Sequence, residues 1–186
     1  MGKLDQKQLP LIFVLGPSGA GKSQLGIWLA DDLHLLHMEI DRWPKGDGID
    51  LEGIRAEWNA YYLGGSITPL ASLLRSRAAK ADRAGTVLTF PGGLVLPPEL
   101  IEASRVEGII TIILYGSEAE CLNAFLAREK GNVRGLDKNF WIQQNSSTYA
   151  QFNYPAYAPY RLNAFQHGRR LERAAIVEAV KKRADL

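Results

Sequence analysis

Cysteine is nearly absent from this sequence: Cys121 is the single cysteine in 186 residues. One thiol cannot close an internal disulfide, and it cannot form the paired-cysteine sets that hold structural zinc. The histidines, which are His34, His37 and His167, are not spaced like metal ligands. We therefore expect no disulfide and no metal site built from cysteine or histidine, and the composition suits a reducing, cytoplasmic compartment.

Long apolar runs and an excess of one charge are missing as well. The run from Leu9 to Leu15 is ended by Gly16, so it is too short for a membrane span or a signal peptide. The net charge is only +2, which lacks the strong basic field of a dedicated nucleic-acid binder. With 46% hydrophobic and 23% charged residues, the composition is that of a soluble globular protein. We expect one cytoplasmic domain over residues 1–186, a monomer or homodimer, with neither membrane nor nucleic acid as a partner.

Apolar, β-branched segments alternate along the chain with segments of helical periodicity. The expected strands are residues 11–15, 36–40, 86–90, 109–114 and 160–165. The expected helices are residues 22–33, 50–62, 69–83, 117–128 and 171–183, the fourth opening on a capping box of Ser117 and Glu120. Because parallel neighbours need crossover connections, this alternation predicts an α/β three-layer sandwich around a five-stranded parallel sheet. Ligands of such sheets bind beyond the carboxyl ends of the strands.

The segment between the first strand and the first helix carries the strongest functional signal. It reads Gly16-Pro17-Ser18-Gly19-Ala20-Gly21-Lys22-Ser23, a complete Walker A pattern that we call the phosphate loop. The glycines let successive N–H groups approach phosphate oxygens, and the helix N-terminus adds its positive dipole end. Lys22 supplies a cation for the β- and γ-phosphates, and the Ser23 hydroxyl is a ligand for Mg²⁺. We predict a P-loop nucleoside triphosphate hydrolase fold that binds the nucleotide through this loop and the following Gln24.

Further absences narrow the kind of P-loop protein. The sequence has no Asn-Lys-x-Asp motif for reading guanine. The strand at residues 86–90 runs into Pro91-Gly92-Gly93 and does not end in the acidic residue expected of a hydrolytic Walker B strand. The chain is also short for the extra modules of motors and transporters. Together these absences favour a compact phosphotransferase.

Three features occur in a fixed order over nearly the whole chain. The first is the phosphate loop, and the second is Glu39-Ile40-Asp41, an acidic-x-acidic pair after the second strand. The third is the hydrophobic strand Val87–Phe90 followed by Pro91-Gly92-Gly93 and the apolar residues 94–96. In this order they resemble the P-loop small-molecule kinases of the shikimate kinase and gluconate kinase type, whose third feature is a glycine-rich acceptor-binding turn. The resemblance implies transfer of the γ-phosphate of ATP to a hydroxyl of a small metabolite, with Mg²⁺.

The resemblance also implies roles for single residues. Asp41 would contact the acceptor hydroxyl and orient it or accept its proton, and phosphoryl transfer independently calls for a carboxylate there. Glu39, Gly92 and Gly93 would join it in binding the acceptor, together with a region at about residues 41–80. The alternative is a purely structural role, in which Asp41 caps a turn at a strand end and Gly92 and Gly93 only form a turn.

The stretch at about residues 128–140 has the composition of a lid that closes over a triphosphate. It combines cations, among them Arg128 and Arg134, with two glycines. In the resembled kinases a lid arginine follows the same helix, so either arginine is expected to stabilise charge during transfer. A guanidinium suits that role because it pairs with phosphate oxygens at two points. The alternative is that Arg128 only favours the C-terminus of a helix.

Two questions stay open at the level of sequence. The aromatic residues between positions 139 and 160 could stack on a base, cover the acceptor, or pack in the core or a dimer interface. The leading function is an ATP-dependent small-molecule kinase with an unidentified acceptor. The alternatives are a nucleotide-binding regulatory NTPase without an acceptor, and a kinase that acts on nucleic-acid ends.

Overall fold

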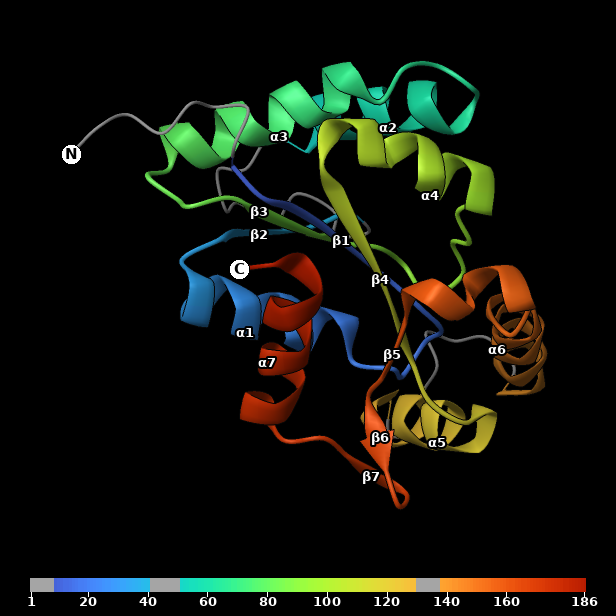
Figure 1. Cartoon of the computed structure of the whole chain (residues 1–186). Coiled ribbons are helices and arrows are strands. Elements are labelled where there is room, and N and C mark those ends of the chain that lie inside the picture. Colours follow the sequence, from blue (N-terminus) through green and yellow to red (C-terminus); the bar gives the residue numbers. More distant parts are fainter. Residues whose placement is uncertain (1–8, 41–50, 130–137) are drawn as a thin grey trace.

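A five-stranded parallel sheet forms the centre of the molecule. The computed structural model describes residues 9–40, 51–129 and 138–186. The strand order is β2-β3-β1-β4-β5, and every neighbouring pair is parallel. The strands are β1 (Leu11–Leu15), β2 (Leu36–Glu39), β3 (Thr86–Thr89), β4 (Ile109–Tyr115) and β5 (Arg161–Asn163). All five overlap the segments expected to be strands, so the predicted α/β sandwich with a parallel sheet is confirmed (Figure 1).

Helices cover both faces of this sheet. Helices α2, α3 and α4 lie on one face, and α1 and α7 lie on the other (Figure 1). Helices α5 and α6 lie together near the carboxyl end of β4. The bounds are α1 Lys22–Leu33, α2 Glu52–Tyr62, α3 Thr68–Lys80, α4 Pro98–Ser104, α5 Glu118–Glu129, α6 Lys138–Phe152 and α7 Arg173–Ala184. The crossovers that a parallel sheet requires therefore supply its two outer layers.

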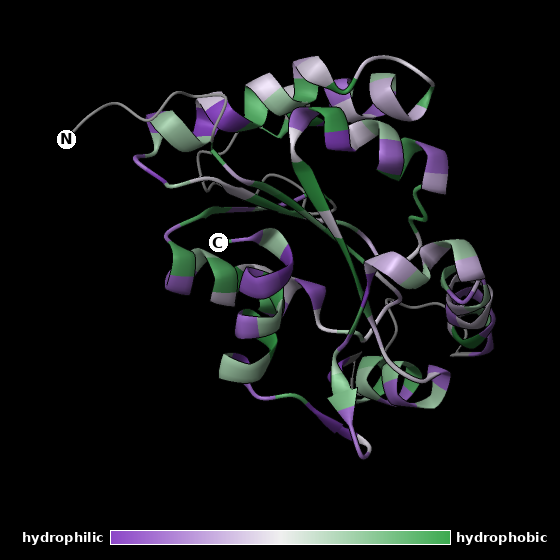
Figure 2. Cartoon of the chain, viewed as in Figure 1, coloured by the Kyte–Doolittle hydropathy of each residue, from purple (hydrophilic) through white to green (hydrophobic). Residues whose placement is uncertain are grey.

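Alternating side chains of β1 divide the core into two halves. Leu11, Phe13 and Leu15 are fully buried and pack in a cluster with residues of α2, α3 and α4. Ile12 and Val14, also fully buried, pack with residues of α1 and α7. Successive side chains of a strand point to opposite faces, so a strand covered on both sides needs a continuous apolar run. Figure 2 shows the central strands in the colours of hydrophobic residues.

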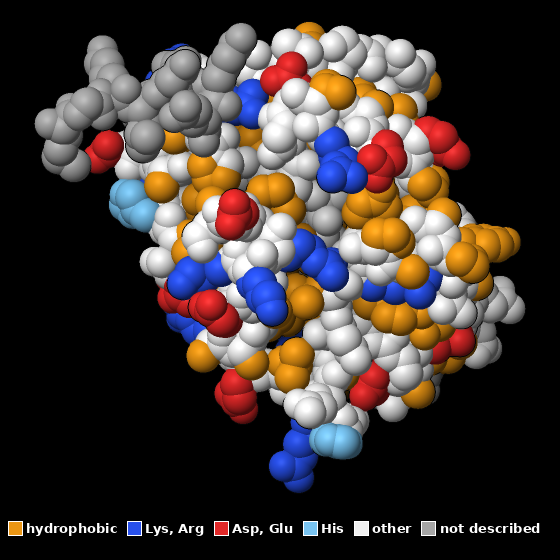
Figure 3. Space-filling view, viewed as in Figure 1, with side chains coloured by type: hydrophobic (Ala, Val, Ile, Leu, Met, Phe, Trp, Pro, Cys, Tyr) orange, Lys and Arg blue, Asp and Glu red, His pale blue; other side chains and the backbone are white. Residues whose placement is uncertain are grey.

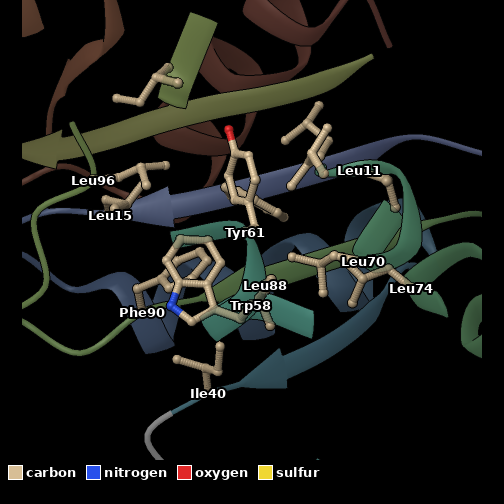
Figure 4. Packing of buried hydrophobic residues seen from close by; sticks show 14 of the residues in the cluster. Leu11, Leu15, Ile40, Trp58, Tyr61, Leu70, Leu74, Leu88, Phe90 and Leu96 are labelled. Carbon is tan, nitrogen blue, oxygen red and sulfur yellow. The ribbon is translucent and has the colours of Figure 1, made fainter. Parts of the chain in front are cut away.

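An aromatic cluster fixes the carboxyl end of β3. The ring centroid of Phe90 lies 4.5 Å from that of Trp58 and 5.2 Å from that of Phe13. Trp58 also meets Tyr61 at 6.1 Å between centroids (Figure 4). Aromatic pairs of this kind contribute about 0.5–1.5 kcal/mol each beyond the burial of their surface. This packing holds the Pro91-Gly92-Gly93 turn, which follows Phe90 directly, at a fixed place.

The predicted capping box at the start of α5 is present. The backbone N–H of Ser117 donates to Glu120 Oε2 at 2.8 Å, and the N–H of Glu120 donates to Ser117 Oγ at 3.2 Å. The Ser117 backbone N–H holds the pKa of the Glu120 carboxyl below its usual range. Two N–H groups of the first turn are thereby satisfied, which fixes where α5 begins.

The structure adds elements that the periodicity does not predict. These are α4, α6, a hairpin of β6 (Phe165–Gln166) and β7 (Arg169–Arg170), and the 3₁₀ turns η2 (Arg105–Glu107) and η3 (Pro155–Tyr160). Among the helices of the described ranges, none is both long and apolar enough to cross a membrane. On the face shown in Figure 3, acidic and basic side chains are interspersed.

Candidate active site

The phosphate loop joins β1 to α1 and packs tightly against two neighbouring elements. Gly16 and Gly19 have φ angles of +137° and +82°, a region that L side chains rarely adopt. A Cβ atom on Gly16 would lie 2.1 Å from the carbonyl oxygen of Leu114, and one on Gly19 would lie 1.9 Å from that of Cys121. These positions therefore require glycine, both for backbone conformation and for space.

Lys22 is the first residue of α1, and its side chain folds across the loop. It is 8% exposed, and its Nζ donates to the carbonyl oxygens of Gly16 at 2.9 Å and Pro17 at 3.0 Å. An ammonium held in this place faces the position that phosphate oxygens take in a P-loop. Charge-assisted hydrogen bonds to phosphate are stronger than bonds to neutral carbonyls, so an incoming phosphate competes well for these N–H groups.

A cavity of about 490 Å³ opens above the loop. Its described lining comprises Ser18, Gly19, Gly21, Lys22, Ser23, Gln24, Ile27, Phe90, Pro91, Gly92, Gly93, Ala124, Phe125, Arg128, Trp141 and Arg170. Most of the residues predicted to bind nucleotide or acceptor are in this set. Gly16, Pro17 and Ala20 form the loop itself without being among the described lining residues, and Ala20 is fully buried.

The turn after β3 lies directly against the phosphate loop. A Cβ atom on Gly92 would lie 2.1 Å from Ser18 Oγ and 2.8 Å from the Ser18 backbone nitrogen. Gly93 has more room, since its Cβ atom would lie 3.6 Å from Gln144 Nε2. The fold thus brings the predicted acceptor-binding turn and the predicted phosphate-binding loop into contact.

The predicted catalytic residues fall partly within the described ranges. Arg128 is exposed in the last turn of α5, lines the cavity, and places its guanidinium carbon 5.6 Å from the centroid of the Phe125 ring. Glu39 ends β2 opposite Thr89 and is not among the described residues that line the cavity. Asp41 and Arg134 lie outside the described residues, as does most of the lid expected at 128–140.

Arg170 is a site residue that the sequence did not reveal. Its Nη2 donates to the carbonyl oxygen of Gly19 at 2.6 Å, and its guanidinium carbon lies 5.6 Å from the centroid of the Phe165 ring. A Cβ atom on Gly21 would lie 3.2 Å from its guanidinium carbon. The β6–β7 hairpin therefore adds a cation to the described cavity lining, which also includes Lys22 and Arg128. The 151 positions that separate Arg170 from Gly19 leave no local pattern that would have found it.

A second, smaller cavity of about 270 Å³ adjoins the first. Its described lining comprises Ser18, Gly92, Gly93, Phe125, Phe140, Trp141, Gln144, Asn145 and Thr148. The first three of these, with Phe125 and Trp141, also line the larger cavity. The two spaces meet where the β3 turn touches the phosphate loop. None of the described residues 51–80, which belong to the predicted acceptor region, lines either cavity.

Of the aromatic residues between positions 139 and 160, some line the smaller cavity and others are buried in the hydrophobic core. Phe140 and Trp141 line the smaller cavity. Phe152 and Tyr157 are buried in the core, and the Tyr157 hydroxyl donates to the carbonyl oxygen of Leu96 at 3.1 Å. Burial raises the pKa of the Tyr157 phenol, which keeps it a neutral donor in that bond.

Solved structures share this fold. Shikimate kinase from Bacteroides thetaiotaomicron matches with a TM-score of 0.57 and 18% identity, covering 95% of this chain and 99% of its own. Shikimate kinase from Acinetobacter baumannii matches with a TM-score of 0.54 and 19% identity, covering 95% and 93%. The tunicamycin resistance protein of Deinococcus radiodurans matches with a TM-score of 0.54 and 14% identity, covering 96% and 97%.

No protein-family model and no curated protein sequence matches the chain. At identities below 20% the structural matches concern the fold alone. The chain therefore has the fold of the P-loop small-molecule kinases that its sequence resembles.

Proposed function

We propose that this protein is an ATP-dependent phosphotransferase that moves the γ-phosphate to a hydroxyl of a small molecule. One observation carries the proposal: the phosphate loop and the Gly92–Gly93 turn touch at Ser18 and line the same cavity. A triphosphate on the loop would then have its terminal phosphate beside a second, adjoining space. Phosphoryl transfer depends mainly on such positioning and on neutralisation of charge.

The nucleotide half of the site has the groups that Mg-ATP requires. Lys22 and Arg170 supply positive charge in the cavity lining, and the loop N–H groups supply neutral donors. The Ser23 hydroxyl also lines the cavity and is the kind of hard oxygen ligand that Mg²⁺ takes alongside phosphate oxygens and water. In the described ranges no three His, Cys, Asp or Glu side chains are grouped to hold a metal ion, so Mg²⁺ would arrive with the nucleotide. Bound there, the ion would neutralise charge on the β- and γ-phosphates.

The acceptor half of the proposal includes residues outside the described ranges. Asp41 follows the carboxyl end of β2 by two positions and would orient the acceptor hydroxyl or accept its proton. Arg128, in the cavity lining, or Arg134 would stabilise charge as the phosphoryl group transfers. We place the reaction in the cytoplasm and the protein in a monomer or homodimer.

Acceptor-dependent release of ADP tests the proposal. The protein, Mg-ATP and a panel of hydroxylated metabolites should give ADP formation that depends on a particular acceptor. Lys22→Ala should lower kcat/KM by about 10²–10³-fold through loss of phosphate stabilisation. Asp41→Asn should lower kcat by about 10²–10⁴-fold through loss of the base. Lys182→Ala, an exposed lysine on α7, is the matched control and should keep full activity.

Three results would count against the proposal. Slow ATP hydrolysis that no metabolite alters would support a regulatory NTPase instead. Transfer of labelled phosphate to an oligonucleotide 5′-end, with no transfer to any metabolite, would support a nucleic-acid end kinase. Full activity of Asp41→Asn would remove Asp41 from the mechanism.

A further inference from the structure

Asn145 in α6 carries a buried carboxamide without a hydrogen-bond partner. The residue is 7% exposed, and neither its Oδ1 nor its Nδ2 is bonded to any group in the part of the chain that the structure describes. A neighbour one turn on, Thr148, satisfies its own hydroxyl by donating to the carbonyl oxygen of Gln144 at 2.9 Å. Asn145 is thus a buried polar group on this helix for which no described residue supplies a hydrogen bond.

Such a group is costly in a folded protein. Buried polar side chains nearly always have a partner, and one without a partner loses its bonds to water and gains nothing in return. A leucine has the same branched skeleton and would avoid that cost. An asparagine lining a cavity with both its polar atoms unpaired is the arrangement that a ligand completes.

The rest of the smaller cavity defines which ligand fits. Phe125, Phe140 and Trp141 give it aromatic walls, and none of the described residues that line it is charged. An anion entering this space would lose its hydration with no cation among those residues to replace it. A cavity of about 270 Å³ suits a single small ring system rather than an extended molecule.

The position of this cavity identifies the occupant as the acceptor. It shares Ser18 of the phosphate loop and Gly92 and Gly93 of the β3 turn with the larger cavity. A molecule held here lies beside the terminal phosphate of a nucleotide on the loop. This step rests on the proposed function, because a protein without phosphotransferase activity would have no acceptor.

We propose that Asn145 recognises an uncharged, ring-containing alcohol through a paired donor and acceptor, as in an amide, lactam or imide. The carboxamide offers one oxygen acceptor and two N–H donors, so it pairs with a group that presents both kinds of atom side by side. The aromatic walls bury the ring of the ligand. A site that hydrogen-bonds its substrate in this way rejects analogues that lack the bonding group.

Equilibrium binding to the full chain tests this without requiring turnover. The uncharged probes are uridine, inosine and 4-(hydroxymethyl)benzamide, each of which carries a hydroxyl and an amide, lactam or imide group. The anionic probes are gluconate and shikimate, and all are titrated by calorimetry in the presence of Mg-ADP. At least one uncharged probe should bind at least tenfold more tightly than both anions. If uridine is that probe, 3-methyluridine, which lacks the imide N–H, should bind about tenfold more weakly than uridine. Tighter binding of either anion than of all three uncharged probes would overturn the proposal.

Two variants of α6 separate recognition from structure. Asn145→Leu should weaken the preferred probe at least tenfold and leave Mg-ADP binding within twofold. Gln143→Leu removes an exposed carboxamide from the same helix and should leave both affinities within twofold. The melting temperature of ligand-free Asn145→Leu should rise by about 2–4 °C, since the unpaired group is gone. A lower melting temperature, or unchanged probe binding, would show that Asn145 supports the fold instead.

The two proposals fail in different ways. In one outcome, no compound gives acceptor-dependent ADP release, but Asn145→Leu still loses probe binding. That outcome would overturn the kinase assignment and leave the recognition by Asn145. Acceptor-dependent ADP release that is best with an anion and insensitive to Asn145→Leu would overturn the recognition and leave the kinase assignment.

Discussion

The two cavities that meet at Ser18 are built in different ways. The phosphate side is shaped by main chain: Gly16 and Gly19 adopt left-handed φ angles and lie against carbonyl oxygens that leave no room for a Cβ atom. The smaller cavity is shaped by side chains, with aromatic rings from α5 and α6 and the amide of Asn145. A backbone cradle depends on residues adjacent in sequence, whereas a side-chain pocket depends on how distant helices pack.

This difference explains why one half of the site has a recognisable pattern and the other does not. Every P-loop must solve the same steric problem around phosphate, so the same glycines recur. A pocket for an acceptor, the role that we propose for the smaller cavity, must fit one particular molecule, and many residue combinations can do that. Changes to the phosphate side should therefore disable the protein, and changes to the acceptor side should alter its specificity.

The largest effect is expected from Gly19→Ala. Its Cβ atom would lie 1.9 Å from the carbonyl oxygen of Cys121, at a φ of +82°. Left-handed strain should cost about 1–2 kcal/mol and overpacking about 1–3 kcal/mol. Together they should lower the free energy of unfolding by about 2–5 kcal/mol. Urea denaturation measures this loss of stability. The folded variant should also fail to bind Mg-ATP.

Gly64→Ala is the matched control for that variant. Gly64 has a φ of +97°, but nothing lies within 4 Å of its Cβ position. It should lose only the strain, about 1–2 kcal/mol, and keep nucleotide binding. Equal losses in the two variants would mean that the contact with Cys121 has no part in shaping the loop.

A smaller effect is expected where the two cavities join. Gly92→Ala would place a Cβ atom 2.8 Å from the Ser18 backbone nitrogen, so the turn and the loop must move apart. We expect kcat/KM to fall by about 10–100-fold, because small displacements of positioned groups are costly in phosphoryl transfer. Gly93→Ala, with its nearest contact at 3.6 Å, should change kcat/KM less than twofold. Steady-state kinetics with the acceptor found by the ADP assay compares the two variants, and equal effects would mean that the close contact between Gly92 and Ser18 does not set the geometry of the site.

The sequence predicted the phosphate side well because its information is local. The expected helix at residues 22–33 coincides with α1, and the five expected strands overlap β1 to β5. Continuous apolar runs mark strands that are covered on both faces, and the P-loop marks the link between the first strand and its helix. The contact of Gly92 with the phosphate loop, which the sequence did not predict, arises because the turn follows β3, the strand that pairs with β1.

The smaller cavity was not predicted, because the information that forms it is not local in the sequence. The sequence of α6, which begins Lys138-Asn139-Phe140-Trp141, is rich in aromatic, Ser, Thr and Asn residues that favour helices weakly, and no capping box of the Ser-x-x-Glu kind opens it. Its helical state follows from packing beside α5 and over the β3 turn. Asn145 and Arg170 therefore had no sequence signal. The roles assigned to Asp41 and Arg134 stay predictions, because those residues lie outside the described ranges.

Arg170 tests whether the phosphate side also depends on a side chain brought from far along the chain. Its guanidinium donates to the carbonyl oxygen of Gly19 at 2.6 Å and lines the cavity. Arg170→Ala should raise KM for Mg-ATP about tenfold, a loss of about 1.4 kcal/mol, with a smaller change in kcat. Arg169→Ala removes the neighbouring exposed arginine of β7 and should leave KM unchanged. If both variants behaved alike, the hairpin would contribute only general positive charge.

The last effect is a pH dependence that arises beneath the phosphate loop. Burial raises the pKa of the Cys121 thiol to about 11, because the thiolate would be poorly solvated there. An unfolded cysteine ionises near pH 8.5, so the folded protein holds this proton over a range in which the unfolded chain has lost it. Cys121 therefore contributes stability that is fully present below about pH 8.5 and is lost as the pH rises towards 11, by about 1–2 kcal/mol in all. Urea denaturation between pH 8 and about 10 should show a decline that Cys121→Ala lacks. This thiol lies in the helix that packs on Gly19. If stability declined equally in the wild-type protein and in Cys121→Ala, the thiol would be hydrated in the folded protein. The phosphate loop would then be packed less tightly than the glycine contacts imply.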